Sequence, residues 1–163
     1  MMTRRFVLTG GTLGTAAAFG AISWCSTLRA TDGAAVTHTD AQWHTLLSPD
    51  QYAVLRQAAT EQPFTSPLLH EKRRGIFACS GCSLDLFSST TKFESGTGWP
   101  SFWTVLPHAV ESSRDTSYDM QRTAISCRRC ASHLGHLFND GPPPTGLRYC
   151  MNGLALTFKP ATA

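Results

Sequence analysis

One cysteine near the carboxyl end of this sequence stands apart from the others, which occur in pairs. It lies in the stretch GLRYCMN, residues 146–152. Side chains alternate between faces in an extended segment, so Arg148, Cys150 and Asn152 would share one face. A neighbouring guanidinium favours the thiolate form of a cysteine, and the thiolate is the nucleophile. We therefore predict a reactive thiol at Cys150, the alternative being a buried cysteine that only packs.

Four other cysteines form two CxxC pairs, Cys79 with Cys82 and Cys127 with Cys130, and 44 residues separate the pairs. Each pair presents two thiolates from one tight turn, and two such turns facing each other complete a tetrahedral Zn²⁺ shell. Because the gap exceeds the roughly 15–20 residues of a compact zinc ribbon, the metal would tie together two parts of a larger sheet. Four thiolates leave no open coordination position, so we predict one structural zinc ion. Disulfides are the alternative in an exported protein.

The sequence around these cysteines predicts a mainly β domain. From Gly75 onward, short apolar runs alternate with clusters of Gly, Pro, Ser and Asp, which is typical of antiparallel strands. Leu154, Leu156 and Phe158 alternate, which predicts one buried face for the last strand. The expected strands are residues 75–78, 84–87, 124–127, 136–138, 147–152 and 154–158.

Two short helices are expected before the strands. The second has a clear start, since Ser48 can cap it, Pro49 suits the first helical position and Gln51 completes a capping box. Tyr52, Leu55 and Ala59 would then share one face. The prolines of residues 60–67 follow the helix.

The amino terminus has the pattern of an export signal. Arg4 and Arg5 directly precede an apolar run, and the next charged residue is Arg29. This uncharged run matches the roughly 20 residues that span a bilayer, although glycines and threonines dilute it. The paired arginines resemble a twin-arginine signal. We predict an export signal at residues 1–35, cleaved after Ala30 or Ala35, and a periplasmic or other extracytoplasmic location. An uncleaved membrane anchor is the alternative.

Residues 36–163 are then one domain of ordinary size, with a linker at Val36–Asp40. The full chain carries a formal charge of +3, and cleavage after Ala35 removes three arginines and one aspartate, leaving 11 basic and 10 acidic residues. A nearly balanced charge gives no electrostatic basis for binding nucleic acid, so we expect none.

Two further stretches supply groups that suit chemistry beside a thiol. KFESGTGWPSF, residues 92–102, is a glycine-containing loop that presents Trp99, and HLGHLFNDGPPPTGLRYCMN, residues 133–152, carries His133 and His136. These segments and the two CxxC pairs resemble those of the methionine-R-sulfoxide reductases, the B class of peptide-methionine sulfoxide reductases (MsrB). The resemblance covers about residues 46–158.

The resemblance implies a fold of two antiparallel sheets of the β-tent kind, with short amino-terminal helices and four cysteines holding zinc. It implies that Cys150 is the nucleophile and that the substrates are oxidised proteins and peptides. The remaining site residues that it implies are Trp99 and Phe138 for substrate binding, and His133, His136, Arg148 and Asn152 for catalysis.

The same chemistry suits the residues themselves. A sulfoxide sulfur becomes electrophilic when its oxygen can accept protons, so the site needs a thiolate and an acid together. Arg148 favours the thiolate, and either His133 or His136 supplies the proton. Attack by Cys150 would yield methionine and a sulfenic acid. Trp99 offers an apolar face for the S-methyl group, which is a physical basis for choosing one epimer.

Regeneration needs a second thiol, and here the sequence departs from the family pattern. Many members carry a resolving cysteine in the loop before Gly-Trp-Pro-Ser-Phe, where this chain has Thr97. Cys25 lies in the predicted leader and would serve only if that leader were retained. We therefore predict a one-cysteine cycle in a monomer, with an external thiol or reductase protein as electron donor. Two other classes remain open: a non-catalytic zinc module, and a thiol oxidoreductase that uses its CxxC pairs.

Overall fold

The structure is a computed structural model that describes residues 35–162. The predicted export signal lies outside the described residues except for Ala35, and Cys25 lies outside them as well. Two helices come first, α1 (Asp40–Leu46) and α2 (Pro49–Gln57), as expected. No helix among residues 35–162 has the length and apolar character needed to cross a membrane.

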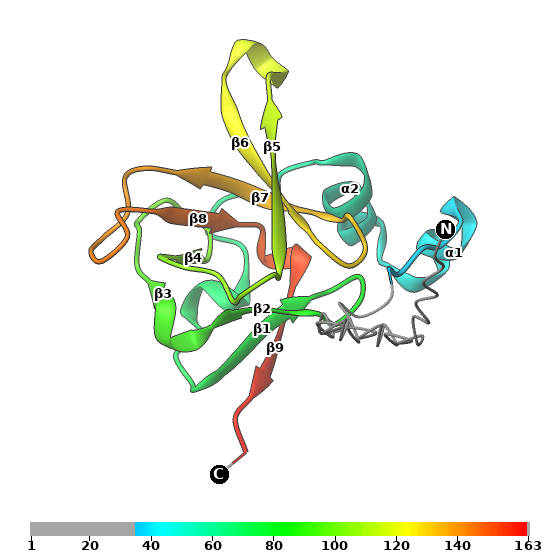
Figure 1. Ribbon diagram of the computed structural model, residues 1–163. Helices are drawn as coiled ribbons and strands as arrows, with labels where there is room; N and C mark the ends of the chain where they lie inside the picture. Colours follow the sequence, from blue (N-terminus) through cyan, green and yellow to red (C-terminus); the bar gives the residue numbers. More distant parts are fainter. Residues whose placement is uncertain (1–34, 163) are drawn as a thin grey trace, which may run out of the picture. The chain divides into compact units, whose positions relative to one another are not determined.

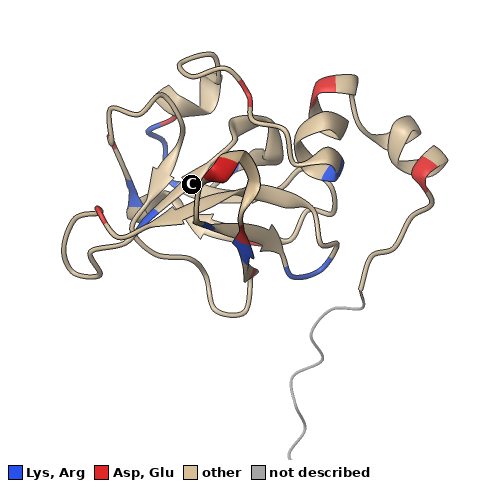
Figure 2. Ribbon diagram, turned by 90° about the horizontal axis from the view of Figure 1, so that it is seen from above, with Lys and Arg blue, Asp and Glu red and all other residues tan. Residues whose placement is uncertain are grey.

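Both helices begin with a capping box, at Thr39 with Gln42 and at Ser48 with Gln51. Each also has an aspartate in its first turn, visible in Figure 2, where it complements the helix dipole. The predicted start of α2 is thus confirmed. The prediction that Ala59 belongs to the same helical face is wrong, because α2 ends at Gln57 and Ala58 adopts a left-handed conformation with φ 55°.

The strands of residues 35–162 form two antiparallel sheets, which confirms the predicted fold class (Figure 1). The smaller sheet has the order β2-β1-β9, and the larger has the order β3-β4-β8-β7-β6-β5. The bounds are β1 (Gly75–Cys79), β2 (Asp85–Ser88), β3 (Lys92–Phe93), β4 (Ser101–Phe102), β5 (Val110–Asp115), β6 (Arg122–Cys127), β7 (His133–Phe138), β8 (Arg148–Met151) and β9 (Leu156–Pro160).

All six expected strands occur, but the sequence did not reveal β3, β4 and β5. The first two are two residues long, and β5 is polar and exposed along most of its length, so it lacks an apolar alternation. The last strand begins at Leu156, because residues 153–155 form a single 3₁₀ turn. The predicted alternation is therefore wrong at Leu154, which lies in that turn while Ala155 is the buried residue.

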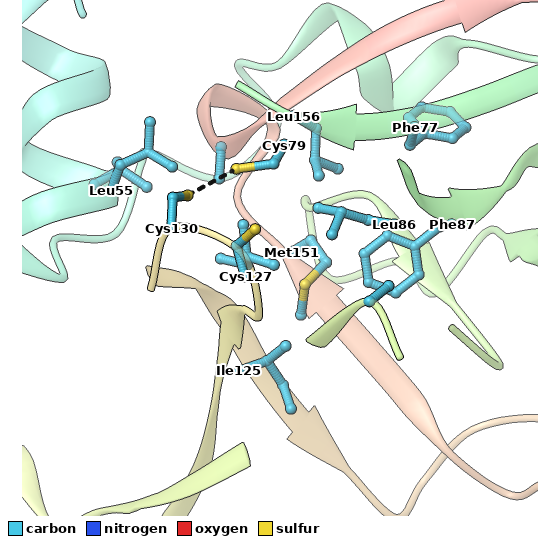
Figure 3. Packing of buried hydrophobic residues seen from close by; sticks show 14 of the residues in the cluster. Leu55, Phe77, Cys79, Leu86, Phe87, Ile125, Cys127, Cys130, Met151 and Leu156 are labelled. Atoms are coloured by element: carbon cyan, nitrogen blue, oxygen red, sulfur yellow. Dashed lines mark hydrogen bonds between the residues drawn. The ribbon is translucent and has the colours of Figure 1, made fainter. Parts of the chain in front are cut away.

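An aromatic cluster holds the two sheets together. The ring of Phe102, from the larger sheet, stacks on Phe87 with centroids 4.3 Å apart and meets Phe77 edge-on at 5.0 Å, both from the smaller sheet. All three side chains are fully buried. Burial of each ring contributes about 1.5–3 kcal/mol, so this contact fixes the sheets relative to each other. Figure 3 shows Phe77 and Phe87 in the same buried cluster as Met151 of β8.

The segment expected to be a linker is part of the fold. The main-chain N–H of Val36 donates to the carbonyl of Arg129 at 2.9 Å, and the Val36 side chain packs against the core. His38 meets Trp43 edge-on, with ring centroids 4.6 Å apart. Residues 36–40 therefore attach the chain beside the second CxxC pair, which corrects the linker prediction.

Candidate active site at Cys150 and candidate metal site

The larger sheet positions Cys150 through its register. His136 of β7 and Ser101 of β4 are the Cα partners of Cys150 on either side, and directly opposed residues in a sheet project from the same face. Two residues along β8, the pair of Arg148 with Phe138 lies on the same face. Arg148 and Cys150 thus share one face of β8, as their spacing in the sequence suggested. The same face continues onto the neighbouring strands.

A glycine allows β7 to come this close to β8. A Cβ on Gly135, whose φ is +158°, would lie 2.1 Å from the carbonyl oxygen of Cys150 and 2.9 Å from the Cα of Met151. Any side chain there would push the strands apart at the reactive residue. Gly135 is a site residue that the sequence analysis did not name, although its place between the two histidines was visible.

A small hollow of about 120 Å³ opens over Cys150. This volume is below the roughly 300 Å³ of the smallest drug-sized pockets, so it accommodates a side chain rather than a whole ligand. The structure brings most of the predicted residues together here. The lining includes Trp99, His136, Phe138, Cys150 and Asn152, together with Thr60 and Arg122, which the sequence analysis did not single out.

The environment of Cys150 shifts its acidity in two directions. Burial raises the pKa of the thiol, and hydrogen bonding from Thr97 and Ser101 and the charge of Arg148 act against this rise. The Oγ1 atom of Thr97 lies 3.8 Å from the Cys150 sulfur. Arg148 therefore acts in the predicted direction, but burial outweighs it, so the pKa of the free protein's thiol lies above its ordinary value.

Arg148 is itself held by an acid that sequence reasoning missed. Its Nε and Nη2 atoms donate to the two carboxylate oxygens of Asp140 at 2.8 and 2.9 Å, and its guanidinium lies 4.3 Å from the centre of the Phe138 ring. The hydrogen bond from Arg148 lowers the pKa of Asp140. Arg148 thus fixes one wall of the hollow as well as placing a positive charge near the sulfur.

The two histidines have different surroundings. The Nε2 atom of His136 lies 2.8 Å from Asp115 on β5, and hydrogen bonds from the hydroxyl and main chain of Ser117, followed by that from His136, hold the pKa of Asp115 far below its usual range. An ionised carboxylate only accepts, so Nε2 of His136 carries the proton toward Asp115. The sequence analysis did not identify Asp115 because it did not predict strand β5, to which Asp115 belongs.

His133 is separated from the thiol. It does not line the hollow over Cys150, and its Nε2 atom is buried with no hydrogen-bond partner among the described residues. Burial, followed by the charge of His136, lowers the pKa of His133 to about 4. At neutral pH this imidazole is uncharged and cannot act as a strong proton donor.

Glu61 organises the other side of the hollow and was not foreseen. Its buried carboxylate accepts hydrogen bonds from the main-chain N–H groups of Gly153 and Leu154. Its own N–H donates to the Asn152 side-chain oxygen at 3.0 Å, and its carbonyl accepts from Trp99 Nε1 at 3.1 Å. Trp99 and Asn152 are therefore held through one segment, which the sequence offered only as a loop after α2.

The two CxxC pairs meet in the core, where they form a candidate metal site. The sulfur atoms of the four cysteines lie within 4.8 Å of one another. The Cys79–Cys130 and Cys82–Cys127 sulfurs are 3.7 and 3.5 Å apart, far beyond the roughly 2.05 Å of a disulfide. Figure 3 shows Cys79, Cys127 and Cys130 side by side next to Leu55.

These separations suit one tetrahedral ion. Metal–sulfur bonds of about 2.3 Å at tetrahedral angles place the sulfurs about 3.8 Å apart, close to the two measured separations. Four sulfurs at such distances, three of them on buried cysteines, need a cation to exist together as thiolates. The cluster could therefore hold a metal ion with all positions filled, which confirms that the predicted ligands come together.

Comparison with known proteins places the chain in a family. The model of the SelR domain matches residues 47–160. A protein named peptide methionine sulfoxide reductase MsrB from Methanosarcina barkeri is 52% identical over 126 residues, which cover 77% of this chain and 89% of the relative. The protein of the same name from Agrobacterium fabrum is 49% identical over 126 residues, covering 77% of this chain and 93% of the relative. The chain therefore belongs to the MsrB family of SelR-domain proteins.

Proposed function

We propose that this protein reduces the R epimer of methionine sulfoxide in polypeptides, with Cys150 as the nucleophile. Its family membership supports methionine sulfoxide reduction, since relatives about 50% identical to it bear the name of that activity. The observation that carries the site assignment is the hollow over Cys150, which is sized for one side chain. Its walls are the Trp99 and Phe138 rings, and His136 lies opposite Cys150 in register.

The aromatic walls select the orientation of the substrate. The S-methyl group packs on Trp99 and Phe138, which leaves the sulfoxide oxygen to face the polar side of the hollow, where His136 lies. Only one arrangement of the three substituents on sulfur satisfies the apolar and polar contacts together. The other epimer would place its oxygen against a ring and leave it without a hydrogen bond.

Proton delivery is assigned to His136. The contact with Asp115 fixes the orientation of the imidazole through Nε2, so Nδ1 is the atom left for the substrate oxygen. Protonation weakens the S–O bond as the Cys150 thiolate attacks the substrate sulfur, so an S–S bond forms and the oxygen leaves as water. Attack of that water on the Cys150 sulfur then breaks the S–S bond, which releases the thioether, forms the sulfenic acid and returns one proton to His136. The net change moves the oxygen from the substrate to Cys150: a thiol and a sulfoxide become a sulfenic acid and a thioether.

The resting pKa of Cys150 suits this order of events. Because burial raises the pKa, the thiol keeps its proton until a substrate fills the hollow. The hydrogen bond of Thr97 and the charge of Arg148 are then in place to stabilise the thiolate as it forms. The thiol proton is the second proton that the departing oxygen needs.

We infer that the ion in the cysteine cluster is zinc and that it has a structural role. Zinc prefers a tetrahedral set of four thiolates, and such a set leaves no open position for substrate. The ligands join β1 and the turn after it to β6 and the turn after that, so the ion links the smaller sheet to the larger one. This arrangement also occupies both CxxC pairs, which argues against their use as free redox dithiols.

The catalytic cycle then depends on an external reductant. Four of the five cysteines among residues 35–162 belong to the cluster, so the sulfenic acid on Cys150 has no second described thiol beside it. Two external thiols would convert it back to the thiol, releasing one water and one disulfide. Either a small thiol or a reductase protein would meet this need.

We further propose that residues 1–35 direct export through a twin-arginine signal and that residues 36–163 are the exported domain. The paired arginines and the uncharged run after them support the proposal. Replacing Arg4 and Arg5 with lysine should keep the full-length precursor in the cytoplasmic fraction. A mature-length protein outside the cytoplasm in that variant would contradict the pathway, and a full-length membrane-bound protein would indicate an anchor.

The enzymatic proposal is tested with purified epimers of a methionine sulfoxide amide and a dithiol as electron donor. The protein should consume the R epimer and leave the S epimer, and Cys150→Ser should abolish turnover while retaining one zinc per chain. Zinc retention shows that the variant is folded. Turnover by Cys150→Ser, or equal use of both epimers, would refute the proposed site.

A further inference from the structure

A second, larger hollow of about 710 Å³ adjoins the one over Cys150. The two share three lining residues, Thr60, Arg122 and His136, so they form a continuous depression. The smaller hollow fits one side chain, so the rest of any polypeptide substrate must lie outside it. The larger hollow is the space into which that chain would continue.

The register of the larger sheet shows how the depression runs. Ser113 of β5 pairs with Ala124 of β6, Ala124 with His136 of β7, and His136 with Cys150 of β8. These four residues form one row on one face of the sheet, with a small side chain at its middle. The row crosses the strands and ends at β5, which is an edge strand of the sheet.

The walls of the larger hollow suit a peptide main chain. Gln57 and Thr60, at and just after the end of α2, line it together with Ser113 and Ser117 of the β5–β6 hairpin, and all four carry hydroxyl or amide groups. Such groups both donate and accept hydrogen bonds, as main-chain amides require. Tyr118, also in the lining, is 84% exposed and offers apolar contact to a flanking side chain.

We propose that this depression binds the polypeptide that flanks the methionine sulfoxide, in an extended conformation running from Cys150 across the sheet to Ser113. The proposal rests on the assignment of Cys150 as the reactive residue and adds where the remainder of the substrate lies. Figure 1 shows the β5–β6 hairpin that forms its outer wall projecting beyond the body of the sheet. The occupant is an unfolded or exposed segment, because a compact surface would not enter a channel lined on both sides.

The size of the depression predicts how many flanking residues should raise kcat/KM. Three strand spacings of about 4.8 Å separate β8 from β5, giving about 14 Å, and an extended chain advances about 3.3 Å per residue. About four flanking residues therefore fill the depression. The value of kcat/KM should rise over the first three or four residues added on one side of the sulfoxide and then level off.

The test compares two series of peptides, extended by one residue at a time on the amino or the carboxyl side, with the blocked amino-acid amide as the shortest substrate. Ser113→Trp fills the depression at its far end, and Ser112→Trp is the matched control, since neighbouring residues of a strand face opposite sides. Both serines are exposed, so neither change disturbs the core. Melting temperatures near that of the unmodified protein verify this.

The expected result is a rise of at least tenfold in kcat/KM with length in one series, lost in Ser113→Trp and kept in Ser112→Trp. The amide should be reduced equally well by all three proteins. Reduction of the amide without any effect of length, or equal losses in both variants, would overturn the inference and leave the assignment of Cys150 intact. Failure to reduce the amide and every peptide would overturn the proposed function, and the inference with it.

Discussion

Replacing Glu61 with glutamine tests whether one buried carboxylate holds the substrate side of the active site. The carboxylate accepts hydrogen bonds from two main-chain N–H groups, those of Gly153 and Leu154, which directly follow Asn152 after the end of β8. Glutamine has nearly the same shape but offers one acceptor and one donor group. One N–H would keep a weaker partner, and the other would face an amide NH₂ in a buried position.

The expected loss of stability in Glu61→Gln follows from these two hydrogen bonds. A hydrogen bond to a charged group contributes about 1.5–3 kcal/mol, and an unsatisfied buried donor costs about 1–3 kcal/mol. We expect Glu61→Gln to lower the free energy of unfolding by about 3 kcal/mol. With an unfolding entropy of about 2.1 cal/mol/K per residue, this corresponds to a fall in Tm of about 11 °C for a domain of this size.

Activity should fall as well, because the main chain of Glu61 contacts both Trp99 and Asn152. Urea unfolding of the zinc-loaded protein measures stability, and kcat/KM for the blocked amide measures the site. Glu111→Gln is the control, since Glu111 is exposed on β5 and its replacement should change stability by less than about 0.5 kcal/mol. The reasoning would be refuted if the free energy of unfolding of Glu61→Gln lay within about 1 kcal/mol of that of the unmodified protein, because the two buried hydrogen bonds would then contribute too little.

Three further predictions concern the metal, a histidine and the threonine beside the thiol. Removing the metal with a chelator should lower the free energy of unfolding by at least about 4 kcal/mol, as for a ligand present at a thousandfold its Kd, and a Tm unchanged in calorimetry would contradict a structural ion. The pKa of His133 is lowered to about 4, against about 6.5 in an unfolded chain, so between pH 6.5 and 4 only the unfolded state binds this proton and stability falls as pH falls. His133→Gln should lose less stability than the unmodified protein over that window in urea titrations, and equal losses would argue against the shift. Thr97→Cys places a second sulfur next to Cys150, where the threonine oxygen is now 3.8 Å from the thiol; after one turnover its intact mass should be two hydrogens below that of the reduced protein, whereas a gained oxygen would show that the two sulfurs do not meet.

The sequence predicted those features that depend on local spacing. Two CxxC pairs were enough to predict that four cysteines come together in a cluster that could hold a metal ion, and the alternation around Cys150 placed Arg148 on the same face as the thiol. A capping box located the start of α2. Each of these inferences needs only residues that are close in the sequence or of a type with few alternative uses.

Features that depend on pairing between distant segments were missed. Asp115 holds His136 and Asp140 holds Arg148, but an acidic residue in a polar stretch has no pattern that identifies its partner. Glu61 is the clearest case, because its hydrogen bonds with Asn152, Gly153 and Leu154 join residues 91–93 positions apart in the chain. The different surroundings of His133 and His136 were not visible in the sequence either, because they depend on which residues of other strands pack around each ring.

The central claim is that Cys150 takes the oxygen from the substrate, and trapping the oxidised sulfur tests it most directly. The reduced, zinc-loaded protein is mixed with one equivalent of the R epimer in the absence of reductant, treated with a probe specific for sulfenic acids, and digested for mass spectrometry. The account predicts one probe per chain, on the peptide containing Cys150, in proportion to the methionine formed. Methionine formed with the probe on a cysteine of the metal cluster, or with no probe on Cys150, would contradict it.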